Sequence, residues 1–282
     1  MAYNRTGGSQ LEFPTYNCGI HLYWADYELP LGDYLKFAMG ALRIIAPPDT
    51  HPSSVLLIDS HHRERRELKG WDEAQAFTDA ELDHHFIAPG KYVYEYSSDE
   101  RLPRDAISPL GFLTSWEIKS ESDTKIWVRI LAGTDHPATP ASVICDFYDD
   151  NDEGILESER VLGLWNALIE YCKPQKARVG TSAIFRDVDP DHDYSFVVGV
   201  RTYFDQPIDA SILPKGLDVA EQSAGTCISL PDGEATKTSV EVPPKLRQLQ
   251  VALGNEGIIK KRRRSRRIVD GRIVFPVVPD DL

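Results

Sequence analysis

The chain has 282 residues, with 31 Lys and Arg against 44 Asp and Glu, which gives a net charge of −13 at pH 7. Its 41% of hydrophobic and 10% of aromatic residues suffice for a folded core, so wholesale disorder is excluded. The acidic balance disfavours nucleic-acid binding by the main body, and without a long apolar run or a signal-like N-terminus we expect a cytoplasmic protein with no membrane partner.

The first hundred residues contain both strand and helix patterns. Ile20, Leu22 and Trp24 alternate along one face of a strand, and apolar residues then recur at helical spacing between Pro30 and Pro47. Proline suits the first turn of a helix and ends it when it comes later, so these two prolines set the bounds of the helix. The expected elements are a strand at 19–27, a helix at 31–45, a strand at 55–58, a helix from Thr78 and a strand at 91–97.

The middle of the chain has the clearest strand signal. Runs rich in Val, Ile, Trp and Phe, separated by turn residues, predict an antiparallel meander, and a long helix follows that ends at Pro174. The runs cover 112–119, 125–132 and 143–148, the helix covers 157–172, and two more strands are expected at 177–185 and 195–204. The pattern predicts an α+β fold with a mostly antiparallel sheet and two main helices packed on it.

The composition changes after Asp205, where Pro, Gly, Ser and Thr become frequent. We expect a flexible N-terminus at 1–15, a main domain at 16–205 and a less regular extension at 206–282. Within the extension, Pro243 and Pro244 predict the start of a short helix that runs to Leu253, and the segment 268–278 predicts a terminal strand.

Two acidic clusters resemble the start of a calcium-binding EF-hand loop, but both fail where the ligand chemistry is strictest. Arg160 stands where the first loop needs its closing Glu, and in the second His192 replaces the glycine and Val198 the Glu. We therefore expect no metal ion, and interpret both clusters as solvated loops or partner contacts. The clusters comprise Asp149, Asp150, Asp152 and Glu153, and Asp187, Asp189, Asp191 and Asp193.

No nucleophile elbow, phosphate-binding loop or metalloprotease motif occurs, so we expect neither an enzyme nor a cofactor. A nuclease could use Asp146, Glu157 and a later lysine, but carboxylates at arbitrary spacing occur in any acidic protein. The histidine pairs at 61–62 and 84–85 are interpreted as surface residues. Four scattered cysteines, at positions 18, 145, 172 and 227, are typical of reduced thiols.

Five tryptophans supply large aromatic side chains. Trp24, Trp127 and Trp165 lie in apolar patterns and are predicted to be core residues. Trp116 follows Ser115 and precedes Glu117, so it fits either the core or a partly exposed position from which it could contact a partner.

One strongly basic segment interrupts the acidic chain: Lys260, Lys261, Arg262, Arg263, Arg264, Arg266 and Arg267. Without these seven residues the remaining chain would carry a net charge of −20. Because an apolar segment follows the run, we favour a solvated or internally paired loop over an arm that binds a partner.

The order of elements resembles the immunity protein 52 family, whose members are antidotes to nuclease toxins of polymorphic and type VI secretion systems. The resemblance spans Tyr16 to Phe204 and rests on the Trp24 strand with its helix, Leu110-Gly111 before Trp116, the segment 127–133, and the helix 156–174 with its Pro-linked strand. It implies a protein that binds a basic nuclease toxin of restriction-endonuclease fold. The resemblance identifies no contact residues, and we take the acidic clusters and Trp116 as the contact candidates.

Two other functions stay open at this point. The chain could be a metal-dependent hydrolase that uses its Asp and His clusters, or an adaptor that contacts nucleic acid or anionic lipid through Lys260–Arg267. The sequence leaves the oligomeric state undetermined.

Overall fold

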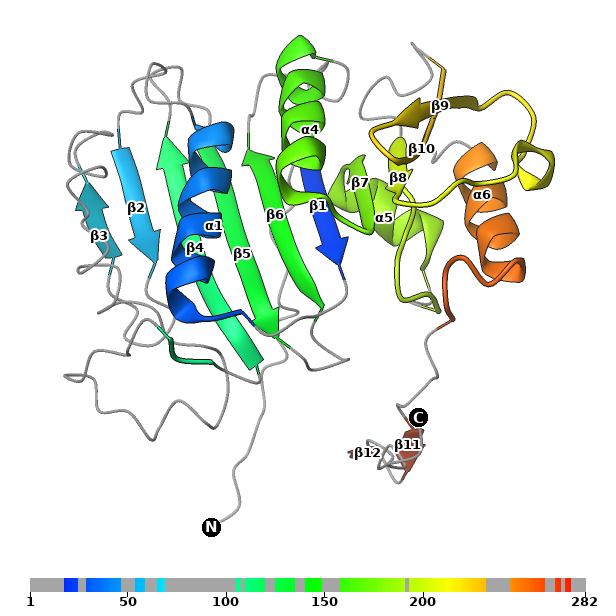
Figure 1. Cartoon of the computed structure of the whole chain (residues 1–282). Coiled ribbons are helices and arrows are strands. Elements are labelled where there is room, and N and C mark those ends of the chain that lie inside the picture. The colour runs from blue at the N-terminus through cyan, green and yellow to red at the C-terminus, as the bar shows by residue number, and fades with distance from the viewer. Residues whose placement is uncertain are drawn as a thin grey trace.

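A computed structural model describes residues 18–24, 29–46, 54–58, 65–68, 105–107, 110–119, 125–134, 140–148, 158–190, 193–231, 244–261, 267–269 and 272–274. Its centre is a ten-stranded sheet in the order β3-β2-β4-β5-β6-β1-β7-β8-β10-β9, with every neighbouring pair antiparallel (Figure 1). The strands are β1 Cys18–Trp24, β2 Ser54–Ile58, β3 Arg65–Leu68, β4 Leu110–Lys119, β5 Lys125–Thr134, β6 Ala141–Tyr148, β7 Lys176–Gly180, β8 Arg201–Phe204, β9 Asp218–Gln222 and β10 Gly225–Ser229.

The described residues form four α-helices beside the sheet: α1 Leu31–Ile45, α4 Glu159–Cys172, α5 Ser182–Val188 and α6 Pro244–Asn255. Helices α1 and α4 lie side by side on one face of the central strands (Figure 1), where Phe37 and Tyr171 stack with ring centroids 5.7 Å apart. Strands and helices together confirm the α+β fold. Among the described residues, no helix is both long enough and apolar enough to span a membrane.

The main core lies between the sheet and helices α1 and α4. Alternate residues of β1, Ile20 and Leu22 among them, are fully buried there, as the strand pattern predicted. The buried phenol of Tyr34 on α1 donates a hydrogen bond to the carbonyl oxygen of Ile130 on β5, 3.0 Å away. This contact satisfies a polar group that burial would otherwise leave without a partner, and it fixes α1 against the sheet.

Local capping chemistry explains where α4 begins and ends. The Ser158 hydroxyl accepts a hydrogen bond from the backbone N–H of Val161 at 3.3 Å, so it caps the first turn. At the other end Lys173 adopts the left-handed conformation, with φ 46°, and Pro174 follows. A left-handed residue followed by proline is a common helix stop.

Two predicted strands are shorter than expected. The prediction for 177–185 is wrong after Gly180, because the Thr181 side chain accepts a hydrogen bond from Ile184 N at 3.1 Å and starts helix α5. In the prediction for 195–204, only Arg201–Phe204 forms a strand. Upstream of it the backbone N–H of Val198 donates to Gln250 Oε1 at 2.8 Å, so a side chain of α6 takes the place of a neighbouring strand.

The C-terminal segment also differs from its prediction. Instead of one strand over 268–278, strand β11 Arg267–Val269 pairs with β12 Arg272–Val274 in a separate antiparallel hairpin. The helix expected from Pro244 is confirmed as α6. The N-terminus at 1–15, the helix expected from Thr78 and the strand at 91–97 lie outside the described residues.

The main sheet continues across the boundary that we expected near Asp205. Strand β8, which ends at Phe204, pairs with β10, and β10 pairs with β9. The buried side chains of Leu246, Leu249 and Leu253 on α6 belong to the same apolar cluster as β1. At this boundary, therefore, residues of the main domain and of the extension share one sheet and one core.

Candidate functional site

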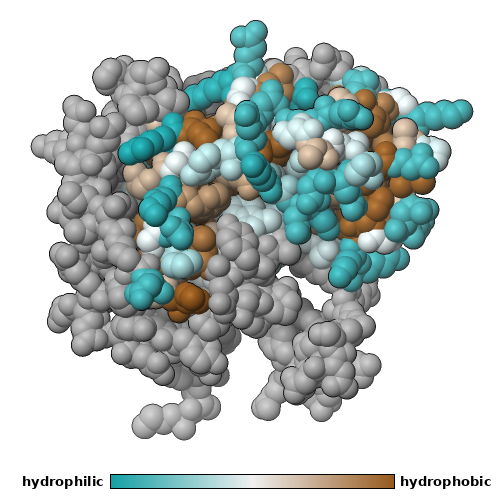
Figure 2. Space-filling view, in the orientation of Figure 1, coloured by the Kyte–Doolittle hydropathy of each residue, from teal (hydrophilic) through white to brown (hydrophobic). Residues whose placement is uncertain are grey.

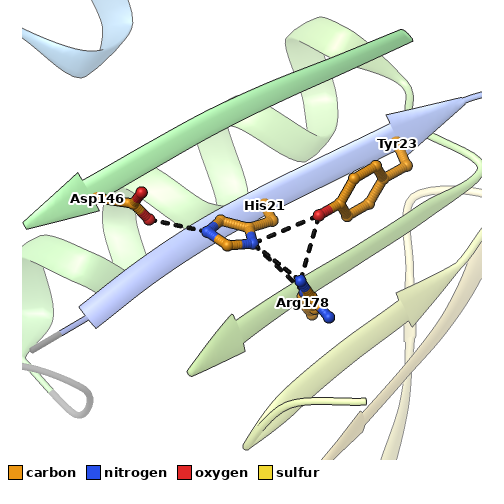
Figure 3. A network of polar contacts seen from close by, with 4 residues as sticks. All are labelled: His21, Tyr23, Asp146 and Arg178. Atoms are coloured by element: carbon orange, nitrogen blue, oxygen red, sulfur yellow. Dashed lines mark hydrogen bonds and ion pairs between the residues drawn. The ribbon is translucent and has the colours of Figure 1, made fainter. Parts of the chain in front are cut away.

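A polar network lies on the sheet face opposite α1 and α4, where three adjacent strands each contribute a charged or polar side chain. His21 of β1 is buried between Asp146 of β6 and Arg178 of β7 (Figure 3). Its Nε2 lies 2.8 Å from Asp146 Oδ1, and its Nδ1 lies 3.2 Å from one terminal nitrogen of Arg178. The Tyr23 hydroxyl, 3.4 Å from the same Nδ1, completes the group.

The partners of His21 fix its tautomer. A guanidinium group can only donate hydrogen bonds, so Nδ1 must accept from Arg178 and Nε2–H must donate to Asp146. Burial lowers the pKa of His21 below its ordinary value of 6.5, and the Arg178 charge lowers it further, while the hydrogen bond to Asp146 opposes both. The imidazole is therefore neutral between a carboxylate and a guanidinium.

Aromatic rings enclose the Arg178 guanidinium. Its Cζ lies 3.8 Å from the centroid of the Phe185 ring on α5, and 5.6 and 5.7 Å from the Tyr23 and Phe196 rings. One terminal nitrogen also donates to the carbonyl oxygen of Val197 at 3.0 Å. Gly180 permits this packing, because a Cβ atom there would stand 2.7 Å from the Phe185 ring. Stacking and hydrogen bonding together compensate the partial burial of the cation.

An aspartate–histidine pair is the arrangement that many enzymes use as a general base, but that chemistry needs a lone pair on the outer nitrogen. Here the Nδ1 lone pair of His21 is engaged by Arg178. While Arg178 stays in place, His21 cannot take up a proton from a substrate. The geometry instead suits a polar clamp that joins β6, β1 and β7.

The sequence contained a signal for this network. A polar residue in the middle of an otherwise apolar strand pattern must find a partner when the strand is buried. His21, Asp146 and Arg178 each occupy such a position, in CGIHLYW, ASVICDFY and KARVG. Which of them meet could not be deduced, because His21 is separated from its partners by 125 and 157 residues.

The second acidic cluster does not form one exposed surface. Asp189 is only 4% exposed, and its two carboxylate oxygens accept hydrogen bonds from the backbone N–H groups of Asp193 and Tyr194. These hydrogen bonds hold the loop that follows Asp189 in place, so we correct the assignment of Asp189 as a partner contact. Asp187, in helix α5 rather than a loop, and Asp193 are both half-buried. Asp191 lies outside the described residues, as do all four members of the first cluster, Asp149, Asp150, Asp152 and Glu153.

Trp116 is a core residue and is withdrawn as a contact candidate. It is 2% exposed, and its indole N–H donates to the Thr114 hydroxyl at 3.1 Å. Trp24 and Trp165 are buried as predicted. Trp127 is half-buried on the face of β5 that points away from the main core, and the Arg129 guanidinium lies 5.7 Å from the centroid of its ring. The prediction of Trp127 as a core residue is therefore only partly right.

The start of the basic run is attached to the body. The carbonyl oxygen of Lys260 accepts a hydrogen bond from Ser195 N at 2.9 Å, and Lys261 forms an isolated β-bridge with Tyr194. Both lysine side chains are exposed. Arg262, Arg263, Arg264 and Arg266 lie outside the described residues, and Arg267 begins β11.

Candidate metal ligands do not gather in the described part of the chain. Those residues contain no group of three or more His, Cys, Asp or Glu side chains that could hold a metal ion. Cys18, Cys145 and Cys227 are buried, and burial raises the pKa of the Cys227 thiol. A thiol with a raised pKa is a poor nucleophile at neutral pH, so Cys227 fits packing rather than catalysis.

A different acidic surface lies at the β9 end of the sheet and was not predicted. Asp205, Asp209, Asp218 and Glu221 are all exposed, and Lys215 is the exposed cation of the same segment, 205–222. Strand β9 carries the last two of these acids at the edge of the sheet. Figure 2 shows hydrophilic side chains in teal over this end of the molecule, with apolar ones in brown between them.

Comparison with known proteins gives little further guidance. No protein-family model matches the chain, and no curated protein matches it. Among solved structures the chain is similar to "Pseudomonas aeruginosa T6SS protein PA0821", at 11% sequence identity and a TM-score of 0.45, over 84% of this chain and 75% of that chain. A match at this level carries no conclusion about function. The resemblance to the immunity protein 52 family therefore stays an expectation from the sequence.

Proposed function

We propose that this protein acts by binding rather than by catalysis, and that it is an immunity protein that neutralises a cognate bacterial nuclease toxin. The observation that carries the proposal is charge. The chain has a net charge of −13, and four carboxylates are exposed in the segment 205–222. A nuclease binds nucleic acid through a basic surface, so an acidic inhibitor is attracted to it from a distance.

The polar network around His21 also supports a role in binding. The Nε2–H of His21 donates to Asp146, and its Nδ1 lone pair accepts from Arg178. Both ring nitrogens of His21 therefore form hydrogen bonds within the protein. A binding protein needs a rigid scaffold, and a clamp between three strands of the sheet supplies rigidity. The family resemblance of residues 16–204 adds the class of partner.

The test begins with the gene beside the one that encodes this protein. We expect its product to be a nuclease that kills or arrests cells when expressed alone, and co-expression of this protein should restore growth. The purified pair should form a complex whose affinity falls as salt concentration rises, because screening weakens attraction between opposite charges. A neighbouring product that is harmless, or toxicity that this protein leaves unchanged, would contradict the proposal.

A second experiment distinguishes a binding role from a catalytic one. The variant Arg178→Gln removes the guanidinium that donates to His21 Nδ1, whereas His21→Gln removes the imidazole. If neutralisation depends on binding alone, both variants protect cells to the extent that they fold, which circular dichroism and thermal unfolding measure. A folded His21→Gln variant that binds the toxin yet fails to protect would indicate a chemical role instead.

A further inference from the structure

We propose that the partner docks by adding a basic strand to the outer edge of β9, so that the ten-stranded sheet continues into the partner. This inference rests on the proposed function and names the surface and the chemistry of its partner. Strand β9 is the last strand of the sheet and, among the strands that the structure describes, pairs with β10 alone. An edge strand presents backbone N–H and C=O groups along its open side, which a second chain can pair with.

The residues of β9 are exposed to solvent along most of the strand. Four successive residues, Asp218 to Glu221, are exposed, and Val219 keeps 42% of its surface open. In a strand, successive side chains point to opposite faces, so exposure of all four means that both faces of the strand are open. The side chain of Val219 therefore offers an apolar contact beside the open backbone.

Strand β9 lacks lysine, proline and a β-bulge, three of the features that block natural edge strands. Natural edges are often blocked by lysine, proline or a β-bulge. The sequence DVAEQ contains neither lysine nor proline, and five consecutive residue pairs join it to β10 without a bulge. The strand is also held in place, since Gln222 Oε1 accepts a hydrogen bond from Trp165 Nε1 at 3.1 Å and its Nε2 donates to Asn166 at 2.8 Å. A fixed edge loses little entropy on pairing.

The charge of β9 indicates which kind of strand could pair with its outer edge. If two copies of β9 paired antiparallel about Ala220, Glu221 of one copy would lie diagonally across from Glu221 of the other, and each strand would also carry Asp218. Like charges on facing strands repel, so the edge disfavours a second copy of itself. A strand with lysine or arginine at these positions would instead form cross-strand ion pairs. The occupant is therefore a basic extended segment, which is the chemistry expected of a nuclease surface.

The first experiment uses a synthetic probe and does not depend on knowing the toxin. An acetylated and amidated peptide of about seven residues, with two Lys three positions apart and Val at the others, is titrated into the full chain, with chemical shifts followed by two-dimensional NMR. We expect shifts centred on residues 218–222, which fall away as salt rises, and no binding of a matched peptide with Glu in place of Lys. Binding elsewhere on the surface, or none, would overturn the proposal.

Two sets of variants make the test specific. Asp218→Lys with Glu221→Lys should weaken peptide binding by about tenfold or more, whereas Glu170→Lys with Glu256→Lys, an equal change of charge at exposed sites elsewhere, should not. Proline is then placed at Val219 and at Ala220. Adjacent residues of an edge strand point their N–H groups to opposite sides, so one variant breaks the ladder to β10 and the other removes only an outward donor.

The proline variant that keeps the wild-type melting temperature is the informative one, and it should lose peptide binding. Retained binding in that variant would show that the backbone edge is not used. An experiment with the cognate toxin tests the immunity function and the docking edge separately. If the Asp218→Lys, Glu221→Lys protein still protects cells, the immunity function is supported and docking at the β9 edge is ruled out. If no toxin is neutralised but the peptide binds at β9, strand pairing at the β9 edge is supported and the immunity function is ruled out.

Discussion

Burial of His21 makes the stability of the protein depend on pH. Above the ordinary pKa of 6.5 the imidazole is neutral in both the folded and the unfolded chain, so pH has no effect through it. Below 6.5 the unfolded chain takes up a proton that the folded chain resists, because burial lowers the folded pKa. We expect the free energy of unfolding to fall as the pH drops below 6.5 in urea titrations, and to fall less in His21→Gln. Equal slopes in the two proteins would contradict the assignment.

The two charged neighbours of His21 should shift its pKa in opposite directions. Removing the cation in Arg178→Gln raises the pKa of His21, whereas removing the anion in Asp146→Asn lowers it. Arg129 also lowers this pKa, as the smallest contribution, so Arg129→Gln should raise it by less than Arg178→Gln does. NMR of the imidazole nitrogens across the pH range measures all three. Shifts of the same sign in the Arg178 and Asp146 variants would show that the two groups do not act through charge.

The contact between helices α1 and α4 depends on a glycine. A Cβ atom at Gly40 would collide with the Tyr171 phenol, whose hydroxyl donates to the carbonyl oxygen of Phe37 at 3.1 Å. Gly40→Ala should therefore displace Tyr171 and destabilise the protein by about 1–3 kcal/mol, as overpacked sites do. Urea unfolding of the variant measures the loss.

Gly163 provides the matched control for Gly40. It lies in α4, and a Cβ atom there would meet nothing within 4 Å. Because alanine favours helix more than glycine does, Gly163→Ala should stabilise the protein by about 0.5–1 kcal/mol. The same substitution in two helices is thus expected to have opposite signs. A stabilising Gly40→Ala would show that Tyr171 can be accommodated elsewhere without loss.

Elements were predictable where one local pattern was strong. The strands β4, β5 and β6 follow from alternating apolar residues, and α1 follows from helical spacing between two prolines. The error at α5 has a local cause, since Ile184 and Phe185 extend the apolar run of β7 while a single Thr181 hydroxyl turns the chain into a helix. The apolar pattern of a strand and of a short buried helix is the same over so few residues.

Strand order and the site depend on the whole molecule, and no local pattern contains them. The polar network needs β1 to lie between β6 and β7, although residues 25–140 separate β1 from β6 along the chain. Likewise, the exposure of Asp218 and Glu221 follows from the position of β9 at the end of the sheet. Composition gave the net charge of −13, but only the topology shows which carboxylates stand at an open edge.

The shared sheet and core predict that the chain unfolds as one unit across Asp205. Leu22 of β1 and Leu249 of α6 lie on opposite sides of that boundary, yet both are buried in one apolar cluster. Leu22→Ala and Leu249→Ala should each cost about 2–5 kcal/mol and lower the same calorimetric transition. Val251→Ala, at a half-exposed position on the same helix as Leu249, should change stability by about 0.5 kcal/mol or less. Two separate transitions, each sensitive to only one of the leucine variants, would instead mean that the regions before and after Asp205 are independent domains.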